Sequence, residues 1–376
     1  GVATRGTRGG GGVKLGEAHA FLGHAVEVGR ADGGVSITAE ITVASVVHEE
    51  HDDVGFGGGV CEWGNNGAQN ESQLLINNNG VFKNEIISRT DNMSSIGMVK
   101  DAVFTDINND NQEDLVIVGH WMAIEIYINN NGAFTNQSKA YGTDKNIGWW
   151  NTITATDTNK DGNIDLLAGN LGTNSKHKAT SEQPFVIMAK DFDSNGTNDI
   201  ALGYYNDNQL YPVRGLQCSS EQVPGIKANI SSYAEFGSLT FDQVYSNFDT
   251  NNAEIHKATY FESALLLNQN NQFTYTALPN TTQVAPTNGI IVLDIDNNGT
   301  DEIISVGNHF PVEVETGRYD AHIGSVMTND FKAISLQNSG FFNDKDARDI
   351  DVITIKGNKH IMVSNNRDTI EFFKIK

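Results

Sequence analysis

One unit recurs along the chain: a short apolar run, a loop of alternating Asp and Asn residues, and a second apolar run. Four segments carry it: VFTDINNDNQEDLVIVGH (103–120), ITATDTNKDGNIDLLAGN (153–170), IMAKDFDSNGTNDIALGY (187–204) and IVLDIDNNGTDEIISVGN (291–308). The flanking runs are short and rich in β-branched residues, which favours β-strands over helices. A chain that repeats strand, loop and strand in this way is expected to fold as an array of similar β units.

A second element accompanies the first. LLINNNGVF (74–82), IYINNNGAF (126–134) and LLLNQNNQF (265–273) each resemble a strand, an Asn-rich turn and another strand, which predicts a β-hairpin. A fifth, eroded copy of the acidic unit is TVASVVHEEHDDVGFGGG (42–59), where Ser45 replaces the first acid.

The spacing of the acidic loops indicates the architecture. The loops begin at residues 106, 157, 191 and 294, so the first interval is 51 residues and the last, 103, is about twice as long, as if one unit there lacked its acids. A period near 50 residues built from four short strands is typical of a propeller blade. We therefore expect an all-β chain that folds as a β-propeller of about 6–7 blades. The sequence does not determine whether the ring of blades closes within this chain.

Three stretches depart from the repeat. Residues 1–40 are Gly-rich and are expected to be poorly ordered, which leaves 41–376 for the propeller. Residues 215–257 mix polar and apolar positions at loosely helical spacing, so we expect an insertion there with one or two short helices. The C-terminal residues 349–376 predict a three-stranded meander without an acidic loop, with KGNK as its first turn.

We call the acidic loops box 1 (106–114), box 2 (157–165), box 3 (191–199) and box 4 (294–302). Oxygen atoms at positions 1, 3, 5 and 9 of each box converge when the backbone curls, and position 7 would add a backbone carbonyl; such oxygen sets suit Ca²⁺. The candidate calcium ligands are Asp106, Asn108, Asp110, Gln112 and Asp114 in box 1; Asp157, Asn159, Asp161, Asn163 and Asp165 in box 2; Asp191, Asp193, Asn195, Thr197 and Asp199 in box 3; and Asp294, Asp296, Asn298, Thr300 and Glu302 in box 4.

The boxes admit two other interpretations, an EF-hand and chance turns. An EF-hand needs a Glu at position 12 and flanking helices, but position 12 here is Ile117, Ala168, Leu202 or Ser305, inside strand-like runs. Chance turns would explain one box, yet four boxes in one order and context favour metal binding. Box 1 has Asn111 where Gly is expected and box 4 has a Glu at position 9, so weaker sites are expected there.

Composition supports cations as partners. Asp and Glu number 47 against 25 Lys and Arg, a formal net charge of −22, which argues against nucleic acid or anionic membranes as ligands. No stretch reaches the roughly 18 apolar residues of a membrane span. Cys61 and Cys218 could form one disulfide at most, so the cysteine content does not indicate whether the protein resides in an oxidising or a reducing compartment.

The motifs resemble a known family. NESQLLINNNGVF (70–82), GMVKDAVFTDINNDNQEDLVIVGHWM (97–122), GWWNTITATDTNKDGNIDLLAGNLGTNSK (148–176) and YPVRGLQCSSEQVPGI (211–226) resemble the FG-GAP/VCBS repeats of integrin-α-like propellers. More narrowly they are similar to bacterial VCBS proteins associated with ASPIC/UnbV domains, although no such domain is present here and residues 1–40 match nothing in that family. The resemblance implies a calcium-binding propeller outside the cytoplasm, at the cell surface or in the periplasm.

Two classes of function follow. The first is a non-catalytic module that binds a protein or glycan; the second is a calcium-dependent polysaccharide lyase, for which Arg214 and Arg318 are candidate uronate contacts. No nucleophile motif of the hydrolase, zinc-protease or P-loop type occurs. His120 and His309 are expected at blade corners, bonded to backbone, and Trp149 and Trp150 are expected to fill a seam between blades rather than a sugar-binding surface.

Overall fold

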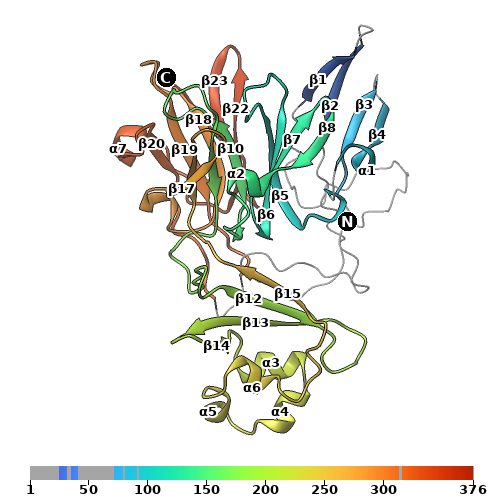
Figure 1. The fold of residues 1–376 in the computed structure, drawn as a ribbon. Helices are drawn as coiled ribbons and strands as arrows, with labels where there is room; N and C mark the ends of the chain where they lie inside the picture. Colours follow the sequence, from blue (N-terminus) through green and yellow to red (C-terminus); the bar gives the residue numbers. More distant parts are fainter. Residues whose placement is uncertain are drawn as a thin grey trace, which may run out of the picture.

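The computed structural model describes residues 25–31, 35–40, 72–78, 81–90, 93–312 and 316–375. Within them the chain is mostly β, in small antiparallel sheets with short helices, and this confirms the expected predominance of strands (Figure 1). The strands are β1 (Ala25–Ala31), β2 (Val35–Glu40), β3 (Leu75–Asn78), β4 (Val81–Asn84), β5 (Met98–Thr105), β6 (Asp114–Met122), β7 (Glu125–Asn130), β8 (Ala133–Asn136), β9 (Gly148–Trp149), β10 (Thr152–Thr156), β11 (Asp165–Gly169), β12 (Phe185–Lys190), β13 (Asp199–Asn206), β14 (Gln209–Pro212), β15 (Glu254–Ala258), β16 (Ala264–Asn268), β17 (Phe273–Ala277), β18 (Thr287–Leu293), β19 (Glu302–Gly307), β20 (Ser325–Thr328), β21 (Ala333–Ile334), β22 (Ala347–Ile355), β23 (Asn358–Asn365) and β24 (Glu371–Lys374). The helices are α1 (Ile86–Arg89), α2 (Ser138–Tyr141), α3 (Leu216–Gln222), α4 (Gly225–Asn229), α5 (Tyr233–Phe236), α6 (Phe241–Val244) and α7 (Leu336–Ser339), with 3-10 turns η1 (Met93–Ser95) and η2 (Asn280–Thr282).

Five sheets have the up-and-down order of propeller blades. Their strand orders are β1-β2-β3-β4, β5-β6-β7-β8, β10-β11-β16-β17, β18-β19-β20-β21 and β22-β23-β24. The three hairpins predicted from Asn-rich turns are confirmed as β3–β4, β7–β8 and β16–β17, and the C-terminal meander as β22–β24. These small antiparallel sheets are consistent with propeller blades.

The sheets stack face to face, because the strand after each box is apolar on both sides. In β6, Val116 and Val118 pack toward the β10–β17 sheet, whereas Leu115 and Ile117 pack on the other face with Leu74. The next two interfaces repeat the arrangement, one between the β10–β17 and β18–β21 sheets and one between the latter and β22–β24. A strand buried on both faces has a continuous apolar run rather than an alternating one, which explains sequences such as DLVIVG.

A glycine at or near the end of each of these strands is required by a close backbone approach. A Cβ placed on Gly119 would lie 2.0 Å from the carbonyl oxygen of Met98, and one on Gly307 would lie 1.9 Å from that of Pro286. These are backbone atoms, which cannot swing aside. The recurring VG and AG endings therefore let neighbouring chain segments meet at the blade corners.

We expect Gly119→Ala to destabilise the fold by about 1–3 kcal/mol or more, the usual cost of forcing extra atoms into a packed site. Gly215→Ala is the matched control, because nothing lies within 4 Å of its added Cβ. Its effect should stay below about 1 kcal/mol, the scale of a change at a helix N-cap such as that of α3. Thermal and urea unfolding of the two variants would show the difference. Equal stabilities would contradict the role given to the corner glycine.

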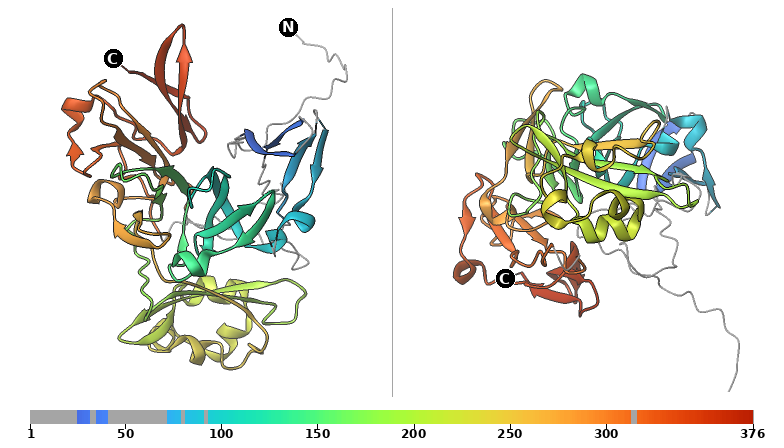
Figure 2. Two further views of the ribbon diagram at one scale, coloured as in Figure 1. Left: turned by 45° about the horizontal axis from the view of Figure 1, so that its top comes forward. Right: turned by 90° about the horizontal axis from the view of Figure 1, so that it is seen from below.

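A large segment is nested within the third of these sheets. Strand β11 pairs not with the next strand in sequence but with β16, so that everything between Gly169 and Ala264 leaves the sheet and returns. This segment forms its own sheet, β14-β13-β12-β15, with α3–α6 packed on one face around Phe192, Phe241 and Tyr245. In Figures 1 and 2 it lies across one end of the other sheets. The helical stretch expected at 215–257 lies inside it.

The nesting corrects the interpretation of the loop spacing. Box 3 lies between β12 and β13 of the inserted sheet, not between two blade strands. The 103 residues from box 3 to box 4 hold the inserted helices, β15 and the two strands that complete the β10–β17 sheet, rather than a blade without acids. Regular spacing failed as a guide because the β10-β11-β16-β17 sheet is interrupted in its middle.

The inserted sheet meets the other sheets through an aromatic cluster. Trp149 packs edge-on against Phe185 with ring centroids 5.7 Å apart, and against Phe261 at 5.0 Å; Trp121 stacks on Phe185 at 5.9 Å. Trp150 is fully buried and stacks on Tyr260. Both tryptophans of GWWN fill seams, as predicted.

Several expectations fall outside the described residues. The structure does not describe the N-terminal segment 1–40 outside β1 and β2. The eroded box at 42–59 and Cys61 also lie outside the described residues. In the described part of the chain, no helix is long and apolar enough to cross a membrane.

Candidate metal centres

All four boxes adopt one loop conformation, held by the side chain at position 1. In box 1 the carboxylate of Asp106 accepts hydrogen bonds from the backbone N–H of Asp110 (3.0 Å) and of Asn111 (2.7 Å). Asp157, Asp191 and Asp294 accept the same two bonds, from positions 5 and 6 of their own boxes. The first acid thus curls the backbone around its own oxygens.

This curled loop requires a residue with a left-handed backbone conformation, that is a positive φ, at position 6. Gly162, Gly196 and Gly299 have φ of 87°, 90° and 84° there, and Asn111 has φ of 64°. Asn tolerates this region better than other residues with a Cβ. The Asn111 departure in box 1 therefore leaves the loop conformation intact.

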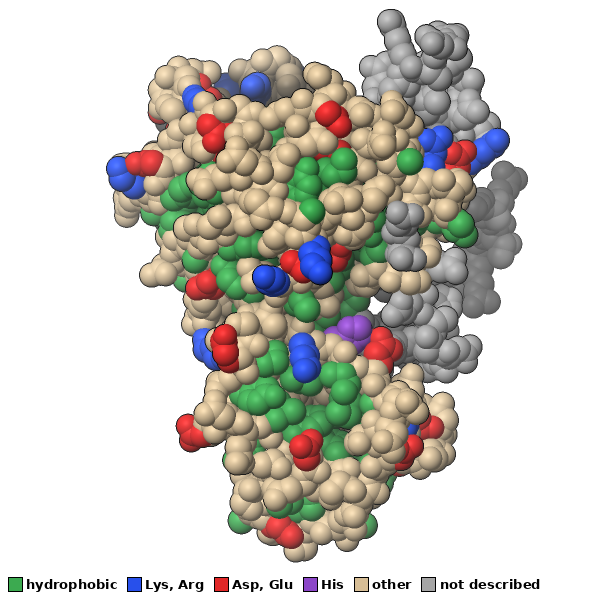
Figure 3. Space-filling view, in the orientation of Figure 1, with side chains coloured by type: hydrophobic (Ala, Val, Ile, Leu, Met, Phe, Trp, Pro, Cys, Tyr) green, Lys and Arg blue, Asp and Glu red, His purple; other side chains and the backbone are tan. Residues whose placement is uncertain are grey.

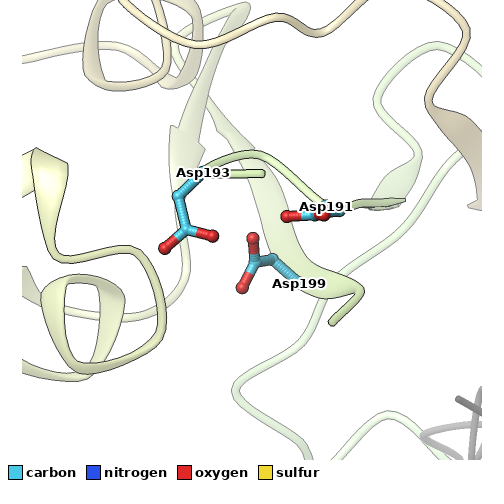
Figure 4. Close-up of side chains that lie close together, drawn as sticks. All are labelled: Asp191, Asp193 and Asp199. Carbon is cyan, nitrogen blue, oxygen red and sulfur yellow. The ribbon is translucent and has the colours of Figure 1, made fainter. Parts of the chain in front are cut away.

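In boxes 3 and 4, positions 1, 3 and 9 converge. Oxygen atoms of Asp191, Asp193 and Asp199 all lie within 4.8 Å of one another, and their carboxylates face a common point (Figure 4). The same holds for Asp294, Asp296 and Glu302. Three carboxylate oxygens at that spacing match the first part of a calcium shell of oxygen ligands.

In boxes 1 and 2, position 3 is an asparagine and the third acid moves to position 5. The amide oxygens of Asn108 and Asn159 accept the backbone N–H of Asp110 (3.0 Å) and Asp161 (2.9 Å), as Asp193 and Asp296 do in the other two boxes. An amide oxygen therefore takes the place of a carboxylate oxygen at position 3.

Position 5 closes the turn toward position 7. Its side-chain oxygen accepts the backbone N–H of position 7 in every box, at 2.7–2.8 Å. The accepting residues are Asp110, Asp161, Asn195 and Asn298, and the donors are Gln112, Asn163, Thr197 and Thr300. The coordination of a metal ion by the backbone carbonyl oxygen of position 7 stays a prediction.

The position 9 acid opens the second strand and is buried. Asp114 and Asp165 are fully buried, and Asp199 and Glu302 are nearly so. Each accepts the backbone N–H of position 2 at 2.9–3.0 Å. The substitution of Glu for Asp in box 4 therefore preserves this bond.

Burial makes the carboxylates of Asp114, Asp199 and Glu302 costly to ionise. It raises the pKa of Asp114 and of Asp199 to about 6, and the negative charges at positions 1 and 3 or 5 add to the effect. The pKa of Glu302 is also raised, first by burial and then by its acidic neighbours. A divalent cation among these oxygens would offset both causes, so the residues present fit a hard cation.

A pH dependence follows. Below about pH 6 the buried acids of boxes 1 and 3 hold a proton that calcium must displace, and above it they are ionised. We expect calcium affinity to fall as pH falls from about 7.5 to about 5. Calorimetric titration at both values would measure it, and an affinity that stayed constant or rose on acidification would contradict the placement of these acids in metal sites.

The sequence pattern did not assign a role to the asparagine of the hairpin motif. The second oxygen of Asp114 accepts the backbone N–H of Asn129 (2.8 Å), and that of Asp165 accepts the backbone N–H of Asn268 (2.9 Å). The Asn129 side chain also donates to the carbonyl of Glu113 at 2.9 Å. The hairpin thus braces the acid that closes the box, and the shared Asn in INNNG and LNQNN was the available signal.

Boxes 1, 2 and 4 lie side by side. The side chain of Asn109 donates to Asn163 at 3.3 Å, which joins box 1 to box 2. Lys160 Nζ donates to the carbonyl oxygen of Gly299 at 3.3 Å, which joins box 2 to box 4. Three acidic loops therefore form one row at the same end of successive sheets, with box 3 apart on the inserted sheet.

The corner histidines differ from expectation. His120 bonds a side chain, with Nε2 2.8 Å from Asn151 Oδ1, rather than backbone. His309 pairs through its backbone with Tyr319, while its ring nitrogen Nδ1 lies 3.1 Å from the guanidinium of Arg348. Sequence reasoning missed Arg348 because it lies in a strand without a box.

Comparison with known families agrees with this geometry. Residues 106–168 match the model of an FG-GAP-like repeat. The matched stretch runs from the first acid of box 1 to the strand after box 2, and so contains two of the three loops in the row. No curated protein matches the chain.

Proposed function

We propose that the chain is a calcium-binding β-propeller that acts outside the cytoplasm as a non-catalytic module for a protein or glycan ligand. The observation that carries the proposal is the row of boxes 1, 2 and 4, which share one hydrogen-bonded loop and contact one another. The extension of the FG-GAP-like match to VCBS proteins of the ASPIC/UnbV-associated kind rests on sequence motifs and belongs to this proposal.

In this proposal calcium has a structural role. Each ion would neutralise the buried acid at position 9 and fix a loop between the first two strands of a sheet. Adjacent loops would then hold one another in place through the Asn109 and Lys160 contacts. Sites of modest affinity suffice outside the cell, where modules with dissociation constants of about 10⁻⁴–10⁻³ M operate.

The surface favours recognition over catalysis. Figure 3 shows Lys and Arg side chains scattered over the displayed face rather than gathered in a basic patch. The two arginines considered for a lyase have other contacts: Arg214 donates to Gln222 at 2.7 Å, and the Arg318 guanidinium lies 3.9 Å from the centre of the Phe310 ring. A lyase requires a base beside a cationic uronate site.

One pair of experiments separates the two classes. Incubation with uronate polysaccharides in calcium should give no unsaturated product at the absorbance of the new double bond. Glycan arrays and affinity capture from candidate host surfaces should then find a ligand whose binding is lost in EGTA. Sustained turnover would show that the protein is a polysaccharide lyase rather than a non-catalytic recognition module.

A further inference from the structure

The hairpin of strands β13 and β14 carries two tyrosines side by side on one face of the inserted sheet. Tyr204 and Tyr211 are direct cross-strand partners, and their ring centroids lie 6.3 Å apart with 40° between the ring planes. Tyr204 is 41 % exposed and Tyr211 is half-buried, whereas both tryptophans of GWWN are buried in seams. The packing of the described sheets thus leaves this tyrosine pair accessible at the surface.

The tyrosine pair is the middle step of a ladder of cross-strand pairs on this face. Residues two apart along a strand share a face, so Leu202 lies one step before Tyr204 and Asn206 one step after it. Leu202 packs in the aromatic cluster that joins the inserted sheet to the other sheets. Asn206 pairs with Gln209, and both residues are exposed. The face therefore changes along the strand from a buried interface to an aromatic step and then to two amides.

Backbone geometry and packing fix the hairpin. Asp207 and Asn208 form its two-residue turn with φ of 48° and 64°, the positive values of the turn type that matches the twist of paired strands. The side-chain amide of Gln183 donates to Asn208 Oδ1 at 2.6 Å, which ties the turn to the segment before β12. On the opposite face, Leu210 packs against the core under α3–α6. The two tyrosine rings are therefore presented by a preorganised backbone.

The hairpin carries almost no charge. In the sequence from 200 to 213, Asp207 is the single acidic residue, and no Lys, Arg or His occurs. The next residue, Arg214, donates to the side chain of Gln222 at 2.7 Å. The polar groups that accompany the tyrosine pair on its face are thus the neutral amides of Asn206 and Gln209 rather than cations that would pair with an anionic ligand.

We propose that the tyrosine pair and the amides of Asn206 and Gln209 form a binding site for a neutral glycan. The C–H face of a sugar ring is apolar and stacks on an aromatic ring, while amide groups donate to and accept from the sugar hydroxyls. Two adjacent tyrosines can stack on consecutive sugar units of one chain. A stable protein interface buries about 800 Å² on each partner, more than two rings and two amides supply, so a glycan is the better match.

This site rests on the proposed role as a recognition module, and it adds the class of ligand and the place of binding. Strand β13 connects it to box 3, because the strand begins at Asp199, the buried acid of that box, and carries Tyr204 farther along. Asp199 accepts the backbone N–H of Phe192 at 2.9 Å, which fixes the start of β13. Loss of calcium from box 3 would disturb the strand that presents the tyrosine pair, in line with the EGTA sensitivity expected of ligand binding.

The test applies the full chain, in calcium, to an array of neutral and anionic glycans, followed by calorimetric titration with the neutral glycan that binds best. We expect Tyr204→Ala to weaken this binding about tenfold or more, the effect of truncating an aromatic anchor. Tyr204→Phe keeps the ring and should retain most of the affinity. Tyr233→Ala is the matched control, because Tyr233 is 67 % exposed on α5 of the same inserted segment.

The outcomes separate this site from the proposed function. Glycan binding that survives both Tyr204→Ala and Tyr211→Ala would overturn the site and leave the recognition role intact. Binding confined to anionic glycans would overturn the neutral class, and a protein ligand lost in Tyr204→Ala, without glycan binding, would assign the tyrosine pair to a protein instead. Failure of wild type to bind any glycan or protein would overturn both proposals. Unfolding curves of the alanine variants that match wild type exclude misfolding as the cause of a loss.

Discussion

Removal of calcium by EGTA is expected to lower the melting temperature of the protein by at least about 5 °C. A ligand held only by the folded state at 100 times its dissociation constant adds about 2.7 kcal/mol per site. One kcal/mol corresponds to about 2–4 °C in a domain of 150–250 residues. With several loops filled, the shift should exceed that of a single site, and differential scanning calorimetry would measure it.

Two controls make the calcium experiment specific. Calcium added in excess over EGTA should restore the original transition, and magnesium should restore it poorly, since Mg²⁺ demands octahedral geometry and dehydrates reluctantly. An unchanged melting temperature in excess EGTA would count heavily against metal sites in the boxes.

The second large effect is expected from Asp165→Ala, compared with Glu302→Ala. Asp165 is fully buried and accepts from the backbone N–H of Thr158 and of Asn268, and from the Thr158 hydroxyl. Its removal leaves buried donors without partners, at about 1–3 kcal/mol each, so we expect a loss of about 2–4 kcal/mol even in EGTA. Glu302 accepts from Ile295, and its loss should cost less.

Asp301→Ala is the control for the box 4 variant, because this acid is adjacent to Glu302 but exposed. Its effect should lie within about 0.5 kcal/mol. Urea unfolding of the three variants in EGTA, and calcium titration of each, would give the order. If Glu302→Ala proved the more damaging in both measurements, the bracing of Asp165 by the hairpin would not have the importance assigned to it.

The sequence predicted local structure better than connectivity. Strands, hairpins and the curled boxes follow from short-range rules, such as alternating Asx residues before a tolerant residue at position 6, and Asn111 showed that Gly is not essential there. Box 3 was assigned to a blade because its loop has the same pattern of oxygen-bearing residues as the others. Nothing local distinguishes a strand that continues to its neighbour from one that leaves, as β11 does.

The contact made by Arg348 escaped prediction for a related reason. Arg348 lies at a bulge in β22, and its guanidinium lies 3.1 Å from His309 Nδ1 only because the sheets are stacked. A bulge leaves no signal in hydrophobic periodicity beyond a single displaced residue. By contrast, Trp149 and Trp150 were assigned correctly to seams, since large aromatics are normally buried whatever the detailed topology.

The nested segment has a consequence for the order in which the chain assembles. Asp165 and Asn268 meet across 103 positions of sequence, a long excursion whose closure costs entropy. The two ends of the excursion are adjacent, since the Gly172 N–H donates to the Phe261 carbonyl at 2.8 Å. If the helices and strands between them fold early, they hold β11 and β16 close together, so that the loop to be closed is short. Substitutions that weaken the core under α3–α6 should then slow refolding of the β10-β11-β16-β17 sheet, although that core contains no residue of this sheet.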